Sequence, residues 1–347
     1  MPRLLENEYL RLEIDLPSGA IKHLIDKETG FDFVPQGKLL GVLEAYRESP
    51  QEATAWVIGQ IKETTPLVQG GTACVTQGGP NRVALRTDRQ YHDSTISVDI
   101  GLNAGSRMVD FTVHTRWLER GTRETGVPML KVAFPVNVTA GTATYEIPFG
   151  SQQRPQSWQE VPALKWADLS DNDHGLTLVN DSKYGHSCND NTLRLTLLRS
   201  SYEPDPLPEL GDHEIRFGVI PHKGPCDVVA ATRAGEEFNS PMAVVSATVQ
   251  PGELPAEKSF VEVQTPNVFV SAVKKAEDSN AVVIRMFEAT GKQTTAKIRV
   301  NGIVKSGAKA VETDVLERPL PINGAELKGD VLTVSIPAFG IATVKIE

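Results

Sequence analysis

Short runs in which apolar and polar residues alternate constrain the fold of this chain more than any other feature of its sequence. The two clearest runs cover residues 96–102 and 109–114, and the turn-forming residues 103–106 separate them. A period of two puts one face of each run against a core, so the pair predicts a β-hairpin. The same period recurs in three further runs, residues 193–197, 215–219 and 331–336.

The rest of the chain continues this pattern. Its 28 glycines and 23 prolines are spread throughout, which is typical of all-β folds with many short strands. Residues 9–15 and 21–26 predict a second hairpin, and Gly30 follows it at a position suited to a positive φ. Only residues 226–239 carry a ragged stripe with the period of a helix. Later strands are predicted at residues 260–263, 268–273, 282–287, 296–300 and 331–346.

The length of 347 residues corresponds to about two domains. Prolines and charged residues are frequent in residues 241–258, which have little strand pattern and therefore predict a junction. We expect a large domain in residues 1–240, a linker in residues 241–258 and a small β-sandwich in residues 259–347. Because strands and helices do not alternate along the chain, this pattern argues against a TIM barrel or a Rossmann domain.

Charge and cysteine content limit the partners and the compartment. A formal net charge of −9 gives no broad attraction for nucleic acid or anionic lipid. The apolar runs are short, and the first residues resemble neither a signal peptide nor a membrane span. Cys74, Cys188 and Cys226 are odd in number and form no C-x-x-C pair, which argues against a disulfide framework. We expect a cytoplasmic protein without a membrane or nucleic-acid partner.

Self-contained catalytic and metal-binding motifs are absent from the sequence. The signatures of phosphate-binding loops, dinucleotide-binding turns, serine hydrolases and zinc proteases do not occur. His114 shares its strand face with polar residues and is expected at a solvated surface. His222 and Cys226 offer a nitrogen and a sulfur but no second pair of zinc ligands. The sequence therefore encodes no local metal site, although an active site can still be assembled from scattered residues.

Two loops are rich in groups that bind cations or sugars. Residues 168–175, with three aspartates, superficially suggest calcium, but the EF-hand spacing is missing and Asx turns between strands explain the same residues. Residues 180–185 place Asp181, Lys183 and Tyr184 in one tight loop. Such a loop either binds sugar hydroxyls beneath a tyrosine ring or is an ordinary hairpin turn with a surface Asp–Lys pair.

Arg199 is an unusual residue in an apolar run. Counting by two along the strand places it on the face of Leu193, Leu195 and Leu197. An unpaired arginine on a buried face is costly. Arg199 therefore either marks the point where the strand reaches solvent or extends toward a carboxylate or ligand on a neighbouring module. The proline-rich residues 200–211 that follow predict a rigid acidic loop.

Many segments of the chain match one known family in order and in residue type. They are Leu5–Asp15, Gly19–Ile21, Asp26–Gly30, Leu130–Pro135, Tyr145–Gly150, Arg154–Pro155, Ala163–Ser170, Asn180–Gly185, Leu193–Arg199, Pro204–Pro206 and Ile336–Gly340. Together they resemble the C-terminal region of glycoside hydrolase family 38, the zinc-dependent α-mannosidases. The resemblance spans nearly the whole chain.

This resemblance implies both an architecture and a role. Family members combine an N-terminal catalytic barrel, a helical bundle and C-terminal β-domains that begin with a galactose-mutarotase-like supersandwich. The chain then corresponds to the β-domains alone: a large supersandwich followed by a smaller β-sandwich. The family's zinc ligands and catalytic aspartates have no matching positions here, so the resemblance implies no catalytic residue, no metal and no cofactor on this chain.

The implied function is that of a non-catalytic module in mannose metabolism. It packs against a catalytic barrel and helical bundle, in cis or as a separate chain, and completes an active site that hydrolyses α-mannosides with retention. By resemblance, Arg199 is the first candidate for substrate binding, followed by Asp181, Lys183 and Tyr184, and then Arg154. The chain alone is expected to be inactive, and an exposed docking face would favour self-association into a homo-oligomer.

Two other functions remain open. A free-standing carbohydrate-binding protein on the same fold would present a cluster of exposed aromatic residues, whereas only 6% of the residues are aromatic. The four tryptophans are Trp56, Trp117, Trp158 and Trp166. An aldose epimerase is supported by analogy of fold alone.

Overall fold

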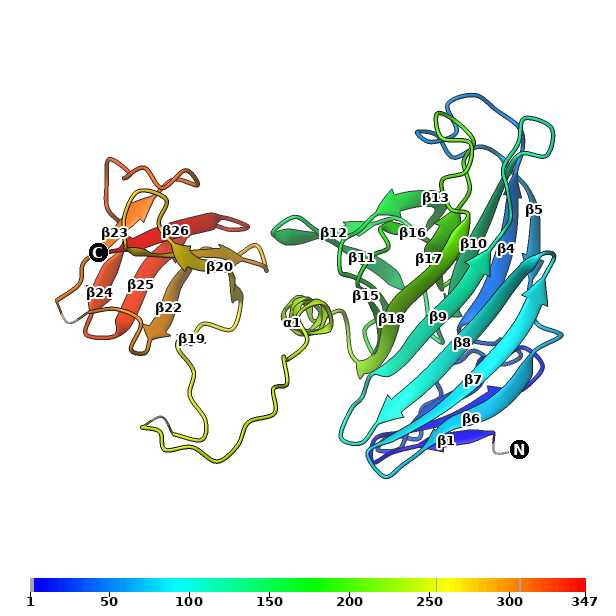
Figure 1. Ribbon diagram of the computed structural model, residues 1–347, viewed down its shortest axis with the longest axis horizontal. Coiled ribbons are helices and arrows are strands. Elements are labelled where there is room, and N and C mark those ends of the chain that lie inside the picture. The colour runs from blue at the N-terminus through cyan, green and yellow to red at the C-terminus, as the bar shows by residue number, and fades with distance from the viewer. Residues whose placement is uncertain (1–2, 254, 306) are drawn as a thin grey trace. The chain divides into compact units, whose positions relative to one another are not determined.

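The computed structural model describes residues 3–253, 255–305 and 307–347 of the chain. These residues form two compact units, and Figure 1 shows their elements. The larger unit contains residues up to 145, together with 152–227 and 233–239. The smaller unit contains residues 240–347 and two short pieces, 146–151 and 228–232. The expected all-β fold class, a large sandwich followed by a smaller one, is confirmed.

The larger unit is built on two extended sheets and a short one. The nine-stranded sheet has the order β12 (Gly150–Arg154), β11 (Thr142–Ile147), β14 (Trp166–Ser170), β15 (His174–Asn180), β18 (Gly211–Lys223), β9 (Val109–Trp117), β8 (Ser94–Asn103), β7 (Arg82–Tyr91) and β6 (Thr72–Gly78). The six-stranded sheet has the order β13 (Ser157–Pro162), β16 (Gly185–Asn189), β17 (Thr192–Arg199), β10 (Val127–Pro135), β4 (Val42–Glu48) and β5 (Ile61–Pro66). The three-stranded sheet has the order β1 (Leu4–Glu6), β2 (Leu10–Asp15) and β3 (Ala20–Asp26).

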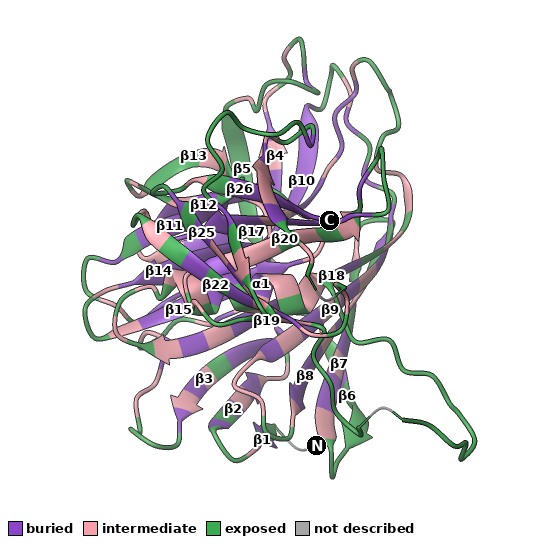
Figure 2. Cartoon of the chain, turned by 90° about the vertical axis from the view of Figure 1, so that its left-hand side faces the viewer, coloured by how far each residue is buried: buried purple, intermediate pink, exposed green. Residues whose placement is uncertain are grey.

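Alternation in the sequence becomes alternation of burial in the strands. The predicted hairpin is β8–β9, in which Val98 lies opposite Val113 and Ile100 lies opposite Phe111. Phe111 packs edge-to-face on Phe134 of the six-stranded sheet, with 5.8 Å between the ring centroids. The core therefore lies between the two extended sheets, as expected when each contributes one apolar face. Figure 2 shows bands of buried and more exposed residues along the strands, and mostly exposed loops.

The hairpin predicted near the start is β2–β3, and Gly30 after it has φ 74°. The predicted helix is α1 (Val228–Asn239), which begins two residues later than expected. Its second half packs on the larger unit, where a Cβ on Gly235 would lie 3.2 Å from Cδ1 of Trp166 and 3.0 Å from Cβ of Lys165. Glycine at this position lets the helix lie close to β14.

A β-bulge in β17 corrects the expected orientation of Arg199. Leu198 pairs with Leu130 of β10, but Thr196 pairs with the next residue, Lys131, so Leu197 is an extra residue without a partner. One inserted residue reverses the alternation beyond it. Arg199 therefore lies on the opposite face from the leucines that precede it, and counting by two across the bulge gives the wrong face.

The smaller unit is a sandwich of two four-stranded sheets. One sheet has the order β19 (Val261–Val263), β22 (Thr294–Val300), β25 (Val331–Ile336) and β24 (Glu326–Lys328). The other has the order β20 (Val268–Lys275), β21 (Val282–Glu288), β26 (Ile341–Ile346) and β23 (Ala310–Thr313). The run predicted at residues 331–346 is two strands, and the short edge strands β23 and β24 were not predicted because three or four residues carry little periodicity.

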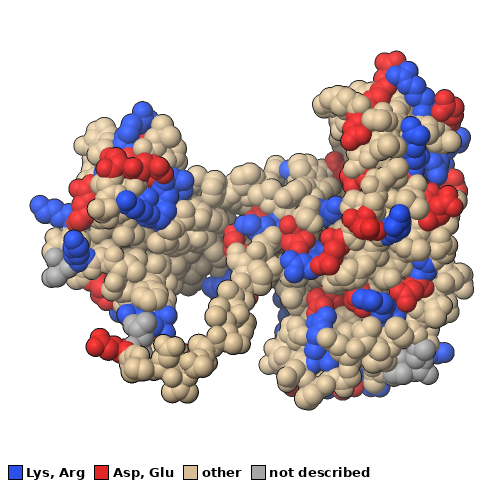
Figure 3. Space-filling view, viewed as in Figure 1, with Lys and Arg blue, Asp and Glu red and all other residues tan. Residues whose placement is uncertain are grey.

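The charged residues on the surface of the larger unit form no large field of one sign. Figure 3 shows acidic and basic side chains intermixed over the visible face of the larger unit. Within the residues that the structure describes, no helix has the length and apolar character needed to cross a bilayer.

Candidate functional site

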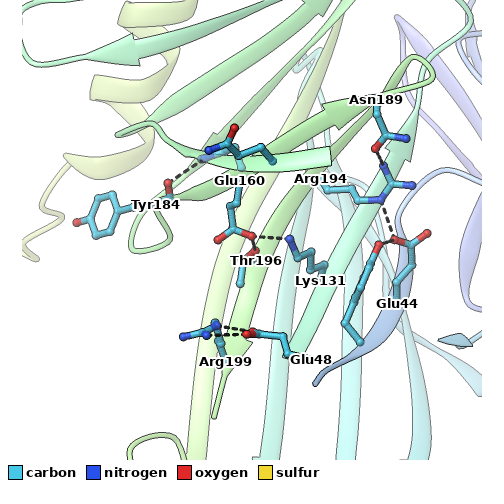
Figure 4. A network of polar contacts seen from close by, with 12 residues as sticks. Glu44, Glu48, Lys131, Glu160, Tyr184, Asn189, Arg194, Thr196 and Arg199 are labelled. Carbon is cyan, nitrogen blue, oxygen red and sulfur yellow. Dashed lines mark hydrogen bonds and ion pairs between the residues drawn. The ribbon is translucent and has the colours of Figure 1, made fainter. Parts of the chain in front are cut away.

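One face of the six-stranded sheet carries a network of charged and hydroxyl groups, which we call the polar face (Figure 4). It lies opposite the leucine face of β17, because its residues alternate with the core residues along β4, β10 and β17. Its members are Glu44, Tyr46, Glu48, Lys131, Glu160, Asn189, Arg194, Thr196 and Arg199. Three carboxylates and three cations are therefore gathered on one sheet.

Arg194 and Glu44 form the first ion pair of the polar face. Nε of Arg194 lies 2.8 Å from Oε2 of Glu44, and Nη1 donates to Oδ1 of Asn189 at 2.8 Å. The hydroxyl of Tyr46 donates to the same carboxylate oxygen. Burial, and secondly the Glu44 charge, raise the pKa of Tyr46 above its ordinary value. The indole of Trp158 lies over the guanidinium, with 5.0 Å from Cζ to the ring centroid, a favourable cation–π contact.

Lys131 and Glu160 form the second ion pair. Nζ of Lys131 donates to Oε2 of Glu160, and the hydroxyl of Thr196 donates to the same oxygen at 2.6 Å. Gly185 gives the carboxylate room, because a Cβ there would lie 2.2 Å from Oε1 of Glu160. The glycine at the end of the predicted sugar loop is thus explained by packing.

Arg199 and Glu48 form the third pair, and it is bidentate. Nε and Nη2 of Arg199 donate to the two oxygens of Glu48 at 2.6 and 2.8 Å. Nη1 donates to the carbonyl of Thr54, and Nη2 also donates to the carbonyl of Val57 at 2.8 Å. Glu48 is fully buried. Every nitrogen of the guanidinium therefore already has a partner within the chain, which satisfies the requirement for burying an arginine.

The loop at residues 180–185 is an Asx turn that connects β15 of the nine-stranded sheet to β16 of the six-stranded sheet, so it is not a hairpin turn. Oδ1 of Asn180 accepts hydrogen bonds from the amides of Ser182 and Lys183, at 3.2 and 2.7 Å. Asp181 pairs with Arg216 of β18 at 2.8 Å, whereas the hairpin-turn alternative paired it with Lys183. Burial lowers the pKa of Lys183, although Glu209 and Asp181 oppose this.

The predicted site residues are brought together only in part. Arg199 belongs to the polar face, whereas Figure 4 shows the ring of Tyr184 pointing away from the other labelled side chains, and it is 57% exposed. Asp181 and Lys183 share the loop of Tyr184. Arg154 ends β12 of the other extended sheet, with its guanidinium 5.6 Å from the ring centroid of Tyr145.

Sequence reasoning missed most of the polar face. A signal was present in β4, where Glu44, Tyr46 and Glu48 alternate with the apolar or long side chains between them. Lys131 inside the otherwise apolar strand β10 was a second signal. Neither signal identified the partners, because those come from strands far apart in the sequence.

A second polar cluster lies on β14. It shows that Asp168 belongs to a strand and not to the loop discussed as a calcium site. Asp168 is buried within the strand, where Oδ2 accepts from Thr177 at 2.6 Å and contacts Nε2 of His222 at 2.8 Å. Burial opposes the charge on His222, but Asp168 outweighs it and raises the pKa of His222. Only Asp171 forms the expected Asx turn, accepting from the amides of Asp173 and His174.

His114 and Cys226 were the remaining residues considered for a surface or a metal-binding role. His114 is partly exposed, as expected, between Asp99 and Glu214 at 3.5 and 3.6 Å. Burial raises the pKa of the Cys226 thiol, which disfavours the thiolate that zinc requires. In the described part of the chain, no three His, Cys, Asp or Glu side chains gather closely enough to hold a metal ion.

Comparison with known proteins finds two family profiles along the chain. The profile described as "Glycosyl hydrolases family 38 C-terminal domain" matches residues 5–207, and "Glycosyl hydrolases family 38 C-terminal beta sandwich domain" matches residues 267–344. Human "Alpha-mannosidase 2C1" is 32% identical over 98% of this chain. "Alpha-mannosidase G" of Dictyostelium discoideum is 30% identical over 84% of this chain.

The chain spans about a third of the length of these relatives, 33% and 28% respectively. Among solved structures, an α-mannosidase from Enterococcus faecalis V583 is similar in fold, with a TM-score of 0.79 over 99% of this chain and 42% of that chain. At 16% sequence identity this likeness concerns the fold alone.

Proposed function

The chain belongs to glycosyl hydrolase family 38, as its C-terminal region, and from this premise we propose that it is the non-catalytic β-region of an α-mannosidase. It packs against a catalytic region outside this chain and completes the active site for hydrolysis of α-mannosides. One observation carries the proposal: two C-terminal family profiles account for most of the chain, while the relatives are about three times longer.

The polar face supports a structural rather than a catalytic role. Glycoside hydrolysis uses two carboxyl groups that are free to meet the substrate. Here Glu44, Glu48 and Glu160 each accept hydrogen bonds from a cation of the same sheet. A carboxylate held in this way is better suited to bracing strands than to transferring protons.

By the family resemblance, the zinc ion belongs to the catalytic region outside this chain, and the described residues of this chain offer no cluster of three ligands for it. Asp168 and the half-buried His222 contact each other at 2.8 Å, but burial raises the pKa of the nearby Cys226 thiol, which disfavours a thiolate ligand beside them. No step of the reaction is therefore assigned to a metal on these residues.

For contact with the sugar we propose the loop of Asp181, Lys183 and Tyr184, of which Tyr184 is the most exposed member. We propose Arg154 as a more distant contributor. Arg199 contributes through the backbone that it holds, because its donors are already engaged by Glu48, Thr54 and Val57. We further propose the domain division at the segment 241–258 and a cytoplasmic location in mannose metabolism, consistent with three free cysteines.

Turnover of an aryl α-mannoside tests the proposal. The 347-residue chain and the complete protein, containing the catalytic region, are assayed side by side with added zinc. We expect hydrolysis by the complete protein and none by the chain. Turnover by the chain at a comparable rate would contradict the proposal. Calorimetric titration of the chain with mannose oligosaccharides detects the alternative, a free-standing sugar-binding protein.

A further inference from the structure

The loop between β4 and β5, residues 49–60, presents three large apolar side chains to solvent. Trp56 is 72% exposed, Val57 51% and Ile58 41%. We call this segment the Trp56 loop. Exposed apolar residues scattered singly are normal, but consecutive ones on a single loop mark interaction surfaces.

Arg199 and Glu48 hold this loop from the side of the sheet. Arg199 donates to the carbonyls of Thr54 and Val57. Oε2 of Glu48 accepts from the amide of Gly59 at 2.6 Å. The side-chain amide of Gln51 donates to the carbonyl of Val57 at 2.8 Å. The backbone on both sides of Trp56 is therefore fastened to a buried ion pair.

The loop after β17 holds the Trp56 loop from the other side. The hydroxyl of Thr54, itself fully buried, accepts from the amides of Tyr202 and Glu203, at 3.1 Å each. Oε2 of Glu203 accepts from the amide of Ala53 at 2.9 Å, and its carbonyl accepts from the amide of Ala55 at 3.1 Å. The second oxygen of Glu203 pairs with Arg123 of the loop after β9. Figure 1 shows these three loops gathered at one end of the larger unit.

Such bracing has a physical consequence for binding. A mobile loop loses conformational freedom when a partner covers it, and this loss weakens the complex. Here the chain's own hydrogen bonds already order the loop. An indole presented on an ordered loop, with aliphatic neighbours, is the residue type that dominates the affinity of protein interfaces.

We propose that the Trp56 loop is the docking surface through which this chain binds the catalytic region of its own protein. This inference rests on the proposed function and adds the surface and the residues. The occupant is argued from length, because about two thirds of each relative lies outside the part that this chain matches. Leu118 and Leu207, on the two loops that brace it, are also exposed, at 39% and 47%, so a partner of apolar surface fits this end of the unit.

Protection from chemical labelling tests the proposal. Val57→Cys is introduced into this chain and into the complete protein, and the rate of maleimide labelling is followed at that peptide by mass spectrometry. Ile322→Cys is the matched control, because Ile322 is 83% exposed and lies in the smaller unit. We expect labelling at position 57 to be at least about tenfold slower in the complete protein, and labelling at position 322 to be unchanged.

Trp56→Ser in the complete protein provides the second readout. We expect it to lower the midpoint of thermal inactivation and to leave KM for an aryl α-mannoside unchanged. Equal labelling of position 57 in both proteins would overturn the inference, and so would a raised KM without protection, which identifies Trp56 as a sugar platform. A complete protein without α-mannosidase activity would instead remove the proposed function, and the inference with it.

Discussion

At the scale of single residues, His186 makes the larger unit sensitive to acid. Burial lowers the pKa of His186 to about 4, and its Nε2 has no hydrogen-bond partner in the described structure. In the unfolded chain, His186 is protonated near the ordinary histidine pKa. In the folded chain, the buried ring stays neutral at that pH. The free energy of unfolding therefore decreases as the pH falls from about 6.5 to about 4.

The histidine's share of this loss is at most about 3 kcal/mol. We expect His186→Leu to lose less stability than the wild type over this interval. Urea unfolding followed by tryptophan fluorescence at pH 7 and pH 4.5 measures both. A parallel loss in the two proteins would show that His186 is not the source.

In the smaller unit, Glu288 is the residue whose ionisation contributes most clearly to pH-dependent stability. Burial alone would raise its pKa, but hydrogen bonds from the hydroxyl and amide of Thr290, the amide of Phe339 and the side chain of Asn267 lower the pKa to about 2. The amides of Gly291 and Lys292 also donate to this carboxylate, at 2.8 and 2.9 Å. The stabilisation is thus complete above the ordinary carboxyl pKa and is lost as the pH falls toward 2.

Glu288→Gln replaces one accepting oxygen by a donor that faces backbone N–H groups. We expect a loss of about 3 kcal/mol at neutral pH, measured by calorimetry as a lower midpoint for the smaller unit. Glu326→Gln, at an exposed position of the same unit, is the control and should change stability by less than about 0.5 kcal/mol. Equal effects of the two substitutions would refute the role of Glu288.

At the scale of elements, Gly126 determines how β10 begins. Its φ is +81°, and a Cβ at this position would lie 1.8 Å from the carbonyl oxygen of Glu48 on β4. Gly105, in the turn between β8 and β9, has a similar φ of +72° with nothing within 4 Å. The two glycines therefore separate backbone strain from steric overlap.

Gly105→Ala adds only the strain of a left-handed conformation, about 1 kcal/mol. Gly126→Ala adds the overlap as well and separates β10 from β4, so we expect a loss of at least about 3 kcal/mol. Chemical denaturation of both variants measures the difference. Similar losses would mean that the backbone around Gly126 relaxes freely.

At the scale of the whole molecule, the segment between the units is exposed and unstructured. Met242, Val244, Val245 and Val249 are almost fully exposed, and residues 240–253 contain no strand or helix. Thermolysin cleaves before such apolar residues, so brief proteolysis should cut first within residues 242–249.

All four tryptophans belong to the larger unit. The two units have separate hydrophobic cores, so we expect the fluorescence midpoint to stay the same after the cut. First cleavage in the Trp56 loop would contradict the predicted cut site and the order of that loop, and a large shift of the midpoint would contradict independent stability of the two units.

The sequence by itself determined the all-β class, the β8–β9 hairpin and the position of the helix, because these depend on local periodicity and turn chemistry. It also carried the family resemblance, which depends on residue types in order along the chain. The sequence did not predict edge strands as short as β23 and β24, because three or four residues fit several patterns equally well.

Only the tertiary structure decided what the charged residues do. One inserted residue at Leu197 reversed the side on which Arg199 lies, and the acidic partners of Arg199, Arg194 and Lys131 come from strands 29 to 151 positions away. Asp168 proved to be a buried acceptor rather than part of a loop. Long-range pairing depends on strand register, and register is set by packing across the sheet, which no local pattern records.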